Sequence, residues 1–357
     1  MGIGLGVITG SGLKLLAPHV IKGTNVLPGW LPVDWLPKSE LEVESEPSSE
    51  GGPKSKQVLS LGKFQTTSEI TTLSQRWLKL ASQQSDLDVS AFMLLLRDGR
   101  YAQLKPDNAL PAASSIKTPI LLASLELIDS GQLRWNEPIQ LTTELVGGGA
   151  GWMGGKPIGS RFPTHEVATE MIRVSDNTAT NLLIARAGGK DVLNSRFNAL
   201  GLSSTVVNNW LPDLEGTNTT SSRDLARSIA LVDTGEVLSP LTRDLFRQVM
   251  ATSVTNTLLP RGLMQGLGGA QGSPDEILRL KGYRVLNKTG DIGIAYADAG
   301  LIELPDGTRA VAAFMVKGPF NDPRSTELIR KMAAAMASEL KPKPAPPIPG
   351  KTEEKNP

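Results

Sequence analysis

The sequence predicts an α+β fold, in which an antiparallel sheet of about five strands is packed by terminal helices and adjoins an all-helical lobe. Strand-like runs lie near both ends of the central region of this 357-residue chain. The stretch between them, from about 114 to 260, is instead dominated by helical spacing of apolar residues. Strands segregated from helices in this way favour a sheet and a separate lobe with a cleft between them.

The first elements are a helix and a strand pair. A helix is expected to start near Thr66–Ser68, and it carries apolar residues at helical spacing: Ile70, Leu73, Trp77 and Leu80. The run Ala91–Leu96 and the return Tyr101–Leu104 flank Asp98-Gly99, a tight-turn dipeptide. These runs predict a hairpin.

A second hairpin and a last helix are expected near the other end of the chain. Gly300–Glu303 and Arg309–Lys317 flank the turn signal Pro305-Asp306-Gly307. The last helix should run from the cap Asp322-Pro323 to about Leu340. Trp77, Met332 and Met336 are expected in the core between the terminal helices and the sheet.

Composition divides the chain into one large domain and its tails. Residues 38–65 are rich in Ser, Glu, Pro, Gly and Lys and predict a flexible linker. Residues 66–340 form the predicted folded domain, and 341–357, rich in Pro and Lys, predict a disordered tail.

The N-terminal segment, residues 1–37, begins with an apolar, uncharged run over residues 1–13. The run is shorter than the roughly 20 residues that a membrane span needs, and no basic residue precedes it. Two interpretations stay open: the end of an export signal or membrane anchor whose true start lies upstream, or an apolar tail without function.

Composition also excludes several kinds of site. The chain has no cysteine, which rules out disulfides, thiolate metal sites and a cysteine nucleophile. His19 lies in the N-terminal segment, so His165 is the one imidazole of the predicted domain, and a base other than histidine is expected. The net charge of +1 argues against nucleic acid as a partner.

The first candidate site is Ser114-Ser115-Ile116-Lys117, at the start of a predicted buried helix that ends at Gly131. Ser114 and Lys117 are three residues apart and share one face. Free N–H groups at a helix N-terminus favour a developing oxyanion, and a desolvated lysine can accept the serine proton. S-x-x-K also occurs elsewhere in this chain, so this pattern alone favours a helix cap with a solvated lysine.

Two further tripeptides distinguish the S-x-x-K pattern at Ser114–Lys117 from its other occurrences in the chain. Ser175-Asp176-Asn177 lies at a break between helical runs, and Lys288-Thr289-Gly290 follows the strand-like run Tyr283–Leu286. Each tripeptide occurs once. S-x-x-K, S-D-N and K-T-G in this order are the signature of class A β-lactamases and penicillin-binding proteins.

On these motifs the region from Ser68 to Leu340 resembles the serine β-lactamase/penicillin-binding protein superfamily, and most closely its class A branch. The resemblance implies a site without metal or cofactor and assigns a role to each motif residue. Ser114 would be the acylated nucleophile, Lys117 its proton acceptor, Ser175 the relay to the leaving amine, and Asn177 the group holding the substrate amide. Lys288 and Thr289 would bind the substrate carboxylate, Gly290 would let the substrate approach, and the N–H groups of Ser114 and Asp291 would form the oxyanion hole.

One stretch departs from class A β-lactamases, which carry W-E-P-E-L-N on a loop after S-D-N. Here the corresponding residues are Trp210-Leu211-Pro212-Asp213-Leu214-Glu215. Leu211 stands where the glutamate that activates the deacylating water is expected, and leucine cannot accept a proton. Either Asp213 or Glu215 substitutes as the base, or the protein resembles the PBP-A group of DD-peptidases, which this short loop and K-T-G-D favour.

The same cleft has further candidate residues. Trp152, on the glycine-rich stretch Gly147–Gly155, is expected at the cleft mouth. That stretch lacks the G-K-[ST] ending of a P-loop. His165 is expected near a helix start or at the surface, and Arg309 at the surface.

Three functions follow as hypotheses. The leading one is a D-alanyl-D-alanine carboxypeptidase or other DD-peptidase, acylated by β-lactams, slow to deacylate and acting on peptidoglycan stem peptides. The alternatives are a class A-like β-lactamase and a non-catalytic β-lactam or muropeptide sensor. The substrate class implies a protein of the periplasm or another extracytoplasmic compartment, with a membrane anchor at its N-terminus if the first interpretation of residues 1–13 holds. The protein is expected to be a monomer.

Overall fold

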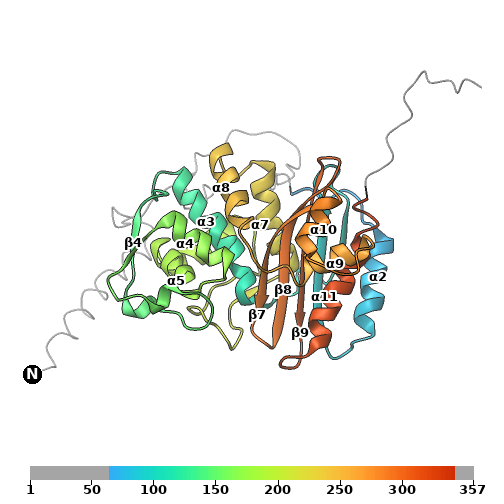
Figure 1. Ribbon diagram of the computed structural model, residues 1–357, viewed down its shortest axis with the longest axis horizontal. Helices are drawn as coiled ribbons and strands as arrows, with labels where there is room; N and C mark the ends of the chain where they lie inside the picture. The colour runs from blue at the N-terminus through green and yellow to red at the C-terminus, as the bar shows by residue number, and fades with distance from the viewer. Residues whose placement is uncertain (1–63, 342–357) are drawn as a thin grey trace, which may run out of the picture. The chain divides into compact units, whose positions relative to one another are not determined.

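The computed structural model describes residues 64–341, and the expectations for the N-terminal segment, most of the linker and the C-terminal tail lie outside these residues. A five-stranded, fully antiparallel sheet crosses the domain (Figure 1). Its strands in spatial order are β2 (Tyr101–Leu104), β1 (Asp88–Leu95), β9 (Arg309–Lys317), β8 (Ala295–Glu303) and β7 (Arg284–Asp291). The predicted fold class and both hairpins are confirmed, and β7 forms one edge.

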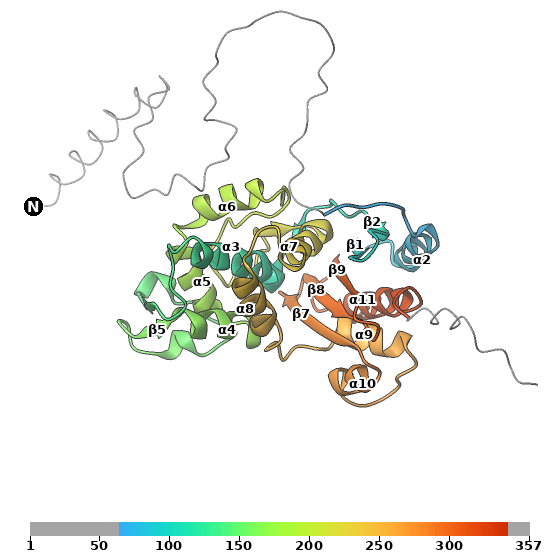
Figure 2. The ribbon, with the colours of Figure 1, turned by 90° about the horizontal axis from the view of Figure 1, so that it is seen from above.

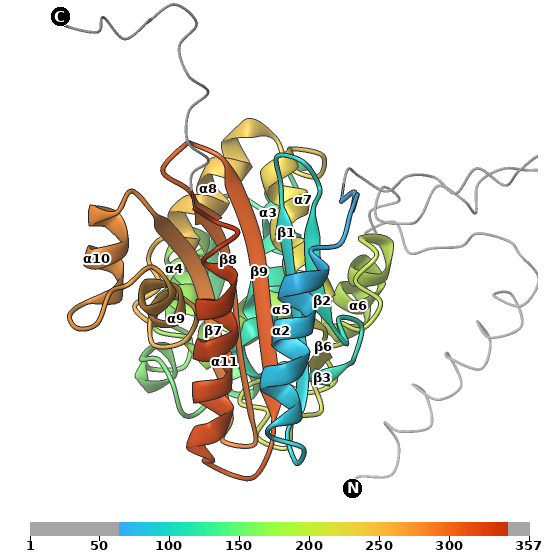
Figure 3. The same ribbon diagram turned by 90° about the vertical axis from the view of Figure 1, so that its right-hand side faces the viewer.

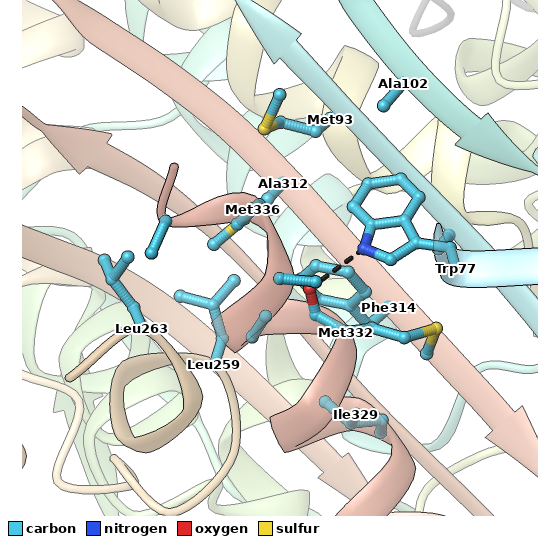
Figure 4. Close-up of a cluster of buried hydrophobic side chains, with 14 of the residues drawn as sticks. Trp77, Met93, Ala102, Leu259, Leu263, Ala312, Phe314, Ile329, Met332 and Met336 are labelled. Carbon is cyan, nitrogen blue, oxygen red and sulfur yellow. Dashed lines mark hydrogen bonds between the residues drawn. The ribbon is translucent and has the colours of Figure 1, made fainter. Parts of the chain in front are cut away.

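One face of the sheet is covered by α2 (Thr71–Ser82) and α11 (Pro323–Met336), which come from opposite ends of the domain (Figure 3). α9 (Leu259–Gly266) and the short α10 (Pro274–Leu280) complete this layer. Trp77 is fully buried here, with its ring edge-on to Phe314 at 5.5 Å between centroids (Figure 4). Its indole N–H donates to the Met332 carbonyl at 2.9 Å, so the predicted core position of Trp77, Met332 and Met336 is confirmed.

The helical lobe lies on the other side of the sheet (Figure 2). It contains α3 (Lys117–Asp129), α4 (Thr164–Arg173), α5 (Asn177–Arg186), α6 (Lys190–Ala199), α7 (Ser222–Thr234) and α8 (Pro240–Met250). α3 runs through its centre and α7 packs against β9 and β1. α3 is buried on every side from Lys117 to Leu127, which fits the apolar residues found all round this helix.

Short pairs of strands and single 3-10 turns connect these helices. β3 (Leu110–Pro111) pairs with β6 (Thr219–Thr220), and β4 (Pro138–Gln140) pairs with β5 (Arg161–Pro163). The turns are η3 (Ala113–Ile116), η4 (Thr143–Leu145) and η5 (Met153–Gly155). Among the described residues, no helix is long and apolar enough to cross a membrane.

Two predicted boundaries were wrong. α2 starts at Thr71 rather than near 66–68, because the preceding segment runs beside β2: the Thr67 N–H donates to the Gly99 carbonyl at 2.8 Å and the Ile70 N–H to the Tyr101 carbonyl at 2.6 Å. α11 ends at Met336, and turns carry the chain on to Leu340. Phe64, assigned to the linker, packs on the Phe92 ring at 5.7 Å between centroids.

Candidate active site

The three motifs meet in one cleft of about 430 Å³ between the sheet edge and the helical lobe. Its walls come from η3, the glycine-rich stretch, the break between α4 and α5, the loop before β6, the segment before α9, and the end of β7. The lining residues are Ala113, Ser114, Gly149, Ala150, Val174, Ser175, Asn177, Leu211, Pro212, Asp213, Leu214, Thr255, Thr289, Asp291 and Ile292. The structure therefore brings Ser114, Ser175, Asn177 and Thr289 together.

Ser114 lies in the 3-10 turn η3, immediately before α3, rather than in the α-helix itself. The turn begins with Ala113 at φ +46°, and the Ser115 hydroxyl donates to the Ala112 carbonyl at 2.6 Å. Lys117 is the first residue of α3 and its side chain is completely buried. Ser114 is thus half-buried at the cleft, and the side chain of Lys117 behind it is shielded from water.

Lys117 Nζ lies among four oxygen atoms. It is 3.0 Å from Ser114 Oγ, 2.9 Å from Ser175 Oγ, 2.7 Å from the Ser175 carbonyl oxygen and 2.8 Å from Asn177 Oδ1. Burial, and secondarily the charge of Lys288, lower the pKa of Lys117 well below its usual value. A neutral amine in contact with Ser114 Oγ is equipped to accept the serine proton.

Ser175 sits at the break between α4 and α5 in a left-handed conformation, with φ +62°. Asp176 fixes this break: its carboxylate accepts from the Ala179 N–H at 2.9 Å, capping α5. The same carboxylate accepts from the backbone N–H groups of Trp152 and Met153 at 2.7 and 2.9 Å. Asp176 therefore holds the glycine-rich stretch and the Ser175 backbone in a fixed relation.

The edge strand β7 supplies the opposite wall. Lys288 is buried, and its Nζ donates to Ser175 Oγ at 3.1 Å and to the Thr289 carbonyl at 2.7 Å. Burial lowers the pKa of Lys288 to about 8, while the charge of Asp298 opposes the decrease. Ser175 Oγ consequently lies between two lysine nitrogens, of which Lys288 is largely charged at neutral pH.

Gly290 brings β7 against the nucleophile turn. A Cβ at this position would lie 2.9 Å from Ser114 N and 2.8 Å from Ser115 N, so only glycine fits without movement of the backbone. Asp291 is exposed and its carboxylate accepts from the Gly293 N–H at 2.8 Å. This close approach is what an oxyanion hole made from the N–H groups of Ser114 and Asp291 requires.

The loop before β6 carries Leu211 into the cleft wall. Leu211 is 5% exposed, and both its backbone groups are held by one side chain: its N–H donates to Asn181 Oδ1 and its carbonyl accepts from Asn181 Nδ2, each at 2.8 Å. The backbone of Leu211 is thus fixed, and an apolar residue lines the cleft at this position.

Neither candidate substitute base is presented to the nucleophile. Asp213 borders the cleft, but its carboxylate accepts from the Thr217 hydroxyl at 2.8 Å and from the Asn218 N–H at 2.6 Å, which holds the loop closed. Glu215 is exposed and is not among the cleft-lining residues of the described chain.

Trp152 was expected at the cleft mouth, and it is not among the residues that line the cleft. Its indole N–H donates to Glu170 Oε2 at 2.9 Å and its ring meets Phe162 edge-on at 5.8 Å between centroids. His165 is exposed near the start of α4, as expected. The Arg309 side chain is 37% exposed and pairs at the surface with the buried Asp233 at 2.8 Å.

Sequence reasoning missed Asn181, Thr255 and Asp298. Asn181 anchors Leu211, as described above. Thr255 lines the cleft and its hydroxyl accepts from the Thr289 hydroxyl at 2.8 Å. Asp298 is fully buried, and burial raises its pKa to about 7. A charged residue within the apolar run of β8 is the one signal that could have pointed to Asp298. Residues 64–341 contain no cluster of three or more potential metal ligands from His, Asp and Glu.

The sequence profile of the β-lactamase enzyme family matches residues 71–340. The chain is 41% identical to a solved structure of PBP-A, with a TM-score of 0.70 over 77% of this chain and 97% of that one. A leucine-to-glutamate variant of PBP-A, solved as an acyl-enzyme complex with penicillin G, aligns with the same TM-score.

Curated relatives are more distant. A β-lactamase of Streptomyces cellulosae is 24% identical over 290 residues, which cover 78% of this chain and 88% of the relative. A β-lactamase of Streptomyces albus G is 28% identical over 169 residues, and this match spans about half (54%) of the relative's length. With the profile matching three quarters of its residues, the chain belongs to the β-lactamase enzyme family of serine hydrolases.

Proposed function

We propose that this protein is an acyl-enzyme hydrolase of the penicillin-binding type, a DD-peptidase that acts on peptides ending in D-alanyl-D-alanine. In this proposal β-lactams acylate the same serine and the resulting acyl-enzyme is long-lived. The observation that carries it is Leu211, an apolar side chain fixed in the cleft wall where hydrolysis needs a base.

Acylation uses groups that are already in contact. Ser114 Oγ attacks the substrate carbonyl while its proton passes to neutral Lys117, 3.0 Å away. The N–H groups of Ser114 and Asp291 stabilise the oxyanion. The proton returns through Ser175 Oγ, 2.9 Å from Lys117 Nζ, to the leaving amine, so the C–N bond breaks and an ester to Ser114 remains.

Substrate binding falls to the remaining motif residues. Asn177 is positioned to hold the substrate amide: its amide donates to the Gly148 carbonyl at 2.8 Å and its oxygen accepts from Lys117. Lys288 supplies positive charge and Thr289 a hydroxyl for the substrate carboxylate. Gly290 leaves room for the substrate beside β7.

The lifetime of the acyl-enzyme tests the proposal. After labelling with a fluorescent penicillin, the protein is expected to keep the label for many minutes and Ser114→Ala to take up none. Rapid turnover of the label would overturn the proposal in favour of a β-lactamase, the function of the curated Streptomyces relatives. In that case Asp213 or Glu215 would have to move to act as the base.

Leu211→Glu provides the sharper comparison. A carboxylate at this position in the cleft wall can activate water, so the variant is expected to lose the label at least tenfold faster than the unchanged protein. Leu211→Gln is the matched control, because glutamine is equal in size to glutamate but is not a base. This variant should retain the label. Equal lifetimes for the Glu and Gln variants would mean that position 211 does not face the acyl group.

A sensor without useful turnover is the remaining candidate. Steady release of D-alanine from a stem pentapeptide, abolished by Ser114→Ala, would exclude a sensor. We also propose that the protein works as a monomer outside the cytoplasm, where stem peptides are found. Fractionation of cells that produce the full chain tests this location.

A further inference from the structure

The carboxylate-binding part of the cleft lacks an arginine. The segment after K-T-G, from Ile294 to Asp298, contains no basic residue, and Arg309 is paired with Asp233 away from the cleft. No arginine is among the described residues that line the cleft, and Lys288 supplies positive charge beside Thr289 on β7. The polar contacts that complete this subsite must therefore come from elsewhere in the cleft wall.

Thr255 is the residue in the right place. It lies in the segment between α8 and α9, is half-buried and lines the cleft together with Ser114 and Thr289. The Thr289 hydroxyl donates to Thr255 Oγ1 at 2.8 Å, which commits the single hydroxyl proton of Thr289 in the free protein. The proton of the Thr255 hydroxyl can then point to Ser253 Oγ, 3.1 Å away, or into the cleft.

The backbone of Thr255 is held by a buried network. Asn287 Nδ2 donates one hydrogen to the Thr255 carbonyl and the other to Asp298 Oδ1, both at 2.9 Å. The second oxygen of Asp298 accepts from the Leu259 N–H at 2.9 Å, at the first residue of α9. Asn287 and Asp298 are 4% and 0% exposed.

Such a network is costly to bury. A fully buried carboxylate needs several hydrogen bonds, and an apolar residue would pack at this position without that cost. Burial of Asp298 raises its pKa to about 7, and groups perturbed to this degree are concentrated at functional sites. Asp298 therefore fixes the segment that carries Thr255.

We propose that Thr255 is a substrate-binding residue that donates a hydrogen bond to the substrate carboxylate beside Thr289, and that Asn287, anchored by Asp298, is its positioning residue. The inference deepens the proposed function by naming a contact for the carboxylate that D-alanyl peptides and penicillins share. It applies to acylation and does not depend on how fast the acyl-enzyme is hydrolysed.

The test compares benzylpenicillin with its methyl ester, which lacks the carboxylate charge. Thr255→Val removes the hydroxyl at nearly constant shape and is expected to slow acylation by benzylpenicillin about tenfold or more, and acylation by the ester less than about twofold. Thr255→Ser should restore most of the rate. Thr257→Val, at an exposed threonine two residues further on, is the matched control and should change neither rate.

Asn287→Leu tests the positioning role. It should slow acylation by benzylpenicillin about as much as Thr255→Val and add little in the Thr255→Val background, since both changes remove one interaction. Fully multiplicative losses would overturn the positioning role. Thermal melting identifies variants that do not fold, and if Asn287→Leu is among them, the two Thr255 variants decide the proposal.

An equal loss for penicillin and ester, or no loss for either, would overturn the role of Thr255. Failure of the proposed function is recognised separately, because rapid turnover of the label by the unchanged protein, or no release of D-alanine from a pentapeptide, would overturn it whatever the effect of Thr255→Val on acylation. Equilibrium binding of benzylpenicillin and its ester to Ser114→Ala, with and without Thr255→Val, still measures the carboxylate contact in that case.

Discussion

At the scale of single residues, the two buried lysines of the site have opposite tasks that depend on opposite charge states. Lys117 has to be neutral to accept a proton, and burial and the nearby charge of Lys288 lower its pKa. Lys288 has to be charged to attract a carboxylate, and the charge of Asp298 keeps its pKa at about 8 in spite of burial. The Asp298 carboxyl is deprotonated above its pKa of about 7. It is therefore charged in the pH range around 8, where Lys288 loses its proton.

Asp298→Asn should therefore change the pH dependence of acylation. Acylation by benzylpenicillin is expected to fall in the unchanged protein as pH rises through about 8, because Lys288 loses its proton. Without the charge of Asp298 the pKa of Lys288 decreases further, so the fall moves to lower pH. Rate constants for acylation measured between pH 5.5 and 9.5, at intervals of half a unit, give both curves.

The matched control for this change is Asp244→Asn, on α8, whose carboxylate is 66% exposed. It should leave the pH at which acylation falls unchanged. An Asp298→Asn profile that coincides with the control would show that Asp298 does not maintain the charge of Lys288.

At the scale of elements, catalysis depends on how closely β7 approaches η3. The space between Gly290 and the backbone of Ser114 and Ser115 excludes a methyl group. Gly290→Ala should push the edge strand outward and misplace the N–H of Asp291, so we expect acylation to fall at least a hundredfold while the domain stays folded. Stopped-flow acylation with circular dichroism measures both.

Gly307→Ala is the matched control for a glycine change. Gly307 lies in the β8–β9 turn at φ +78°, with open space around its Cα. The Gly307→Ala substitution is expected to lower the stability of the folded protein through backbone strain alone and to leave the rate of acylation unchanged. Full acylation of Gly290→Ala would show that β7 can move without loss of function.

The elements that local signals specify were predictable from sequence. Asp98-Gly99 and Pro305-Asp306-Gly307 marked both hairpins, and Asp322-Pro323 marked the start of α11. The start of α2 was not predictable, because pairing of residues 67–70 with β2 overrides local helical preference. A register set by a partner thirty residues away leaves no trace in the spacing of apolar residues.

The same distinction holds for the site. The motif serines and lysines could be predicted because their spacing is a known pattern, and the structure brings them together. Thr255 and Asn181 could not, since each works through a partner about thirty residues away and neither belongs to a local pattern. The hydrogen bond from the Trp152 indole to the buried Glu170 could not be predicted either, because sequence alone does not show such a contact.

At the scale of the whole molecule, the packing that stabilises the fold is separate from the site. Trp77 joins α2 to α11 and the sheet, on the face opposite the helical lobe. Trp77→Phe removes the indole N–H that donates to the Met332 carbonyl and loses contacts around the smaller ring. We expect the free energy of unfolding to fall by about 1–3 kcal/mol and Tm by several degrees.

Acylation by penicillin should remain within about twofold of the unchanged rate in this variant at 25 °C. Leu78→Ala, on the same helix at 55% exposure, is the control and should alter Tm little. Slower acylation by Trp77→Phe without a lower Tm would contradict the separation of this core from the cleft.

The surroundings of Lys117 have a consequence for how freely a proton moves in the site. Four oxygen atoms lie within 3.0 Å of its Nζ, whereas an ammonium has three protons and a neutral amine has two. At least one of the four oxygens therefore receives no proton from Lys117 in either state: Ser175 Oγ can accept from Lys288 instead, and Ser114 Oγ can donate its own proton to a neutral amine. These alternative partners let the hydrogen bonds around the nitrogen change without its moving: Ser114 can give up its proton and Ser175 can receive one while the lysine stays in place.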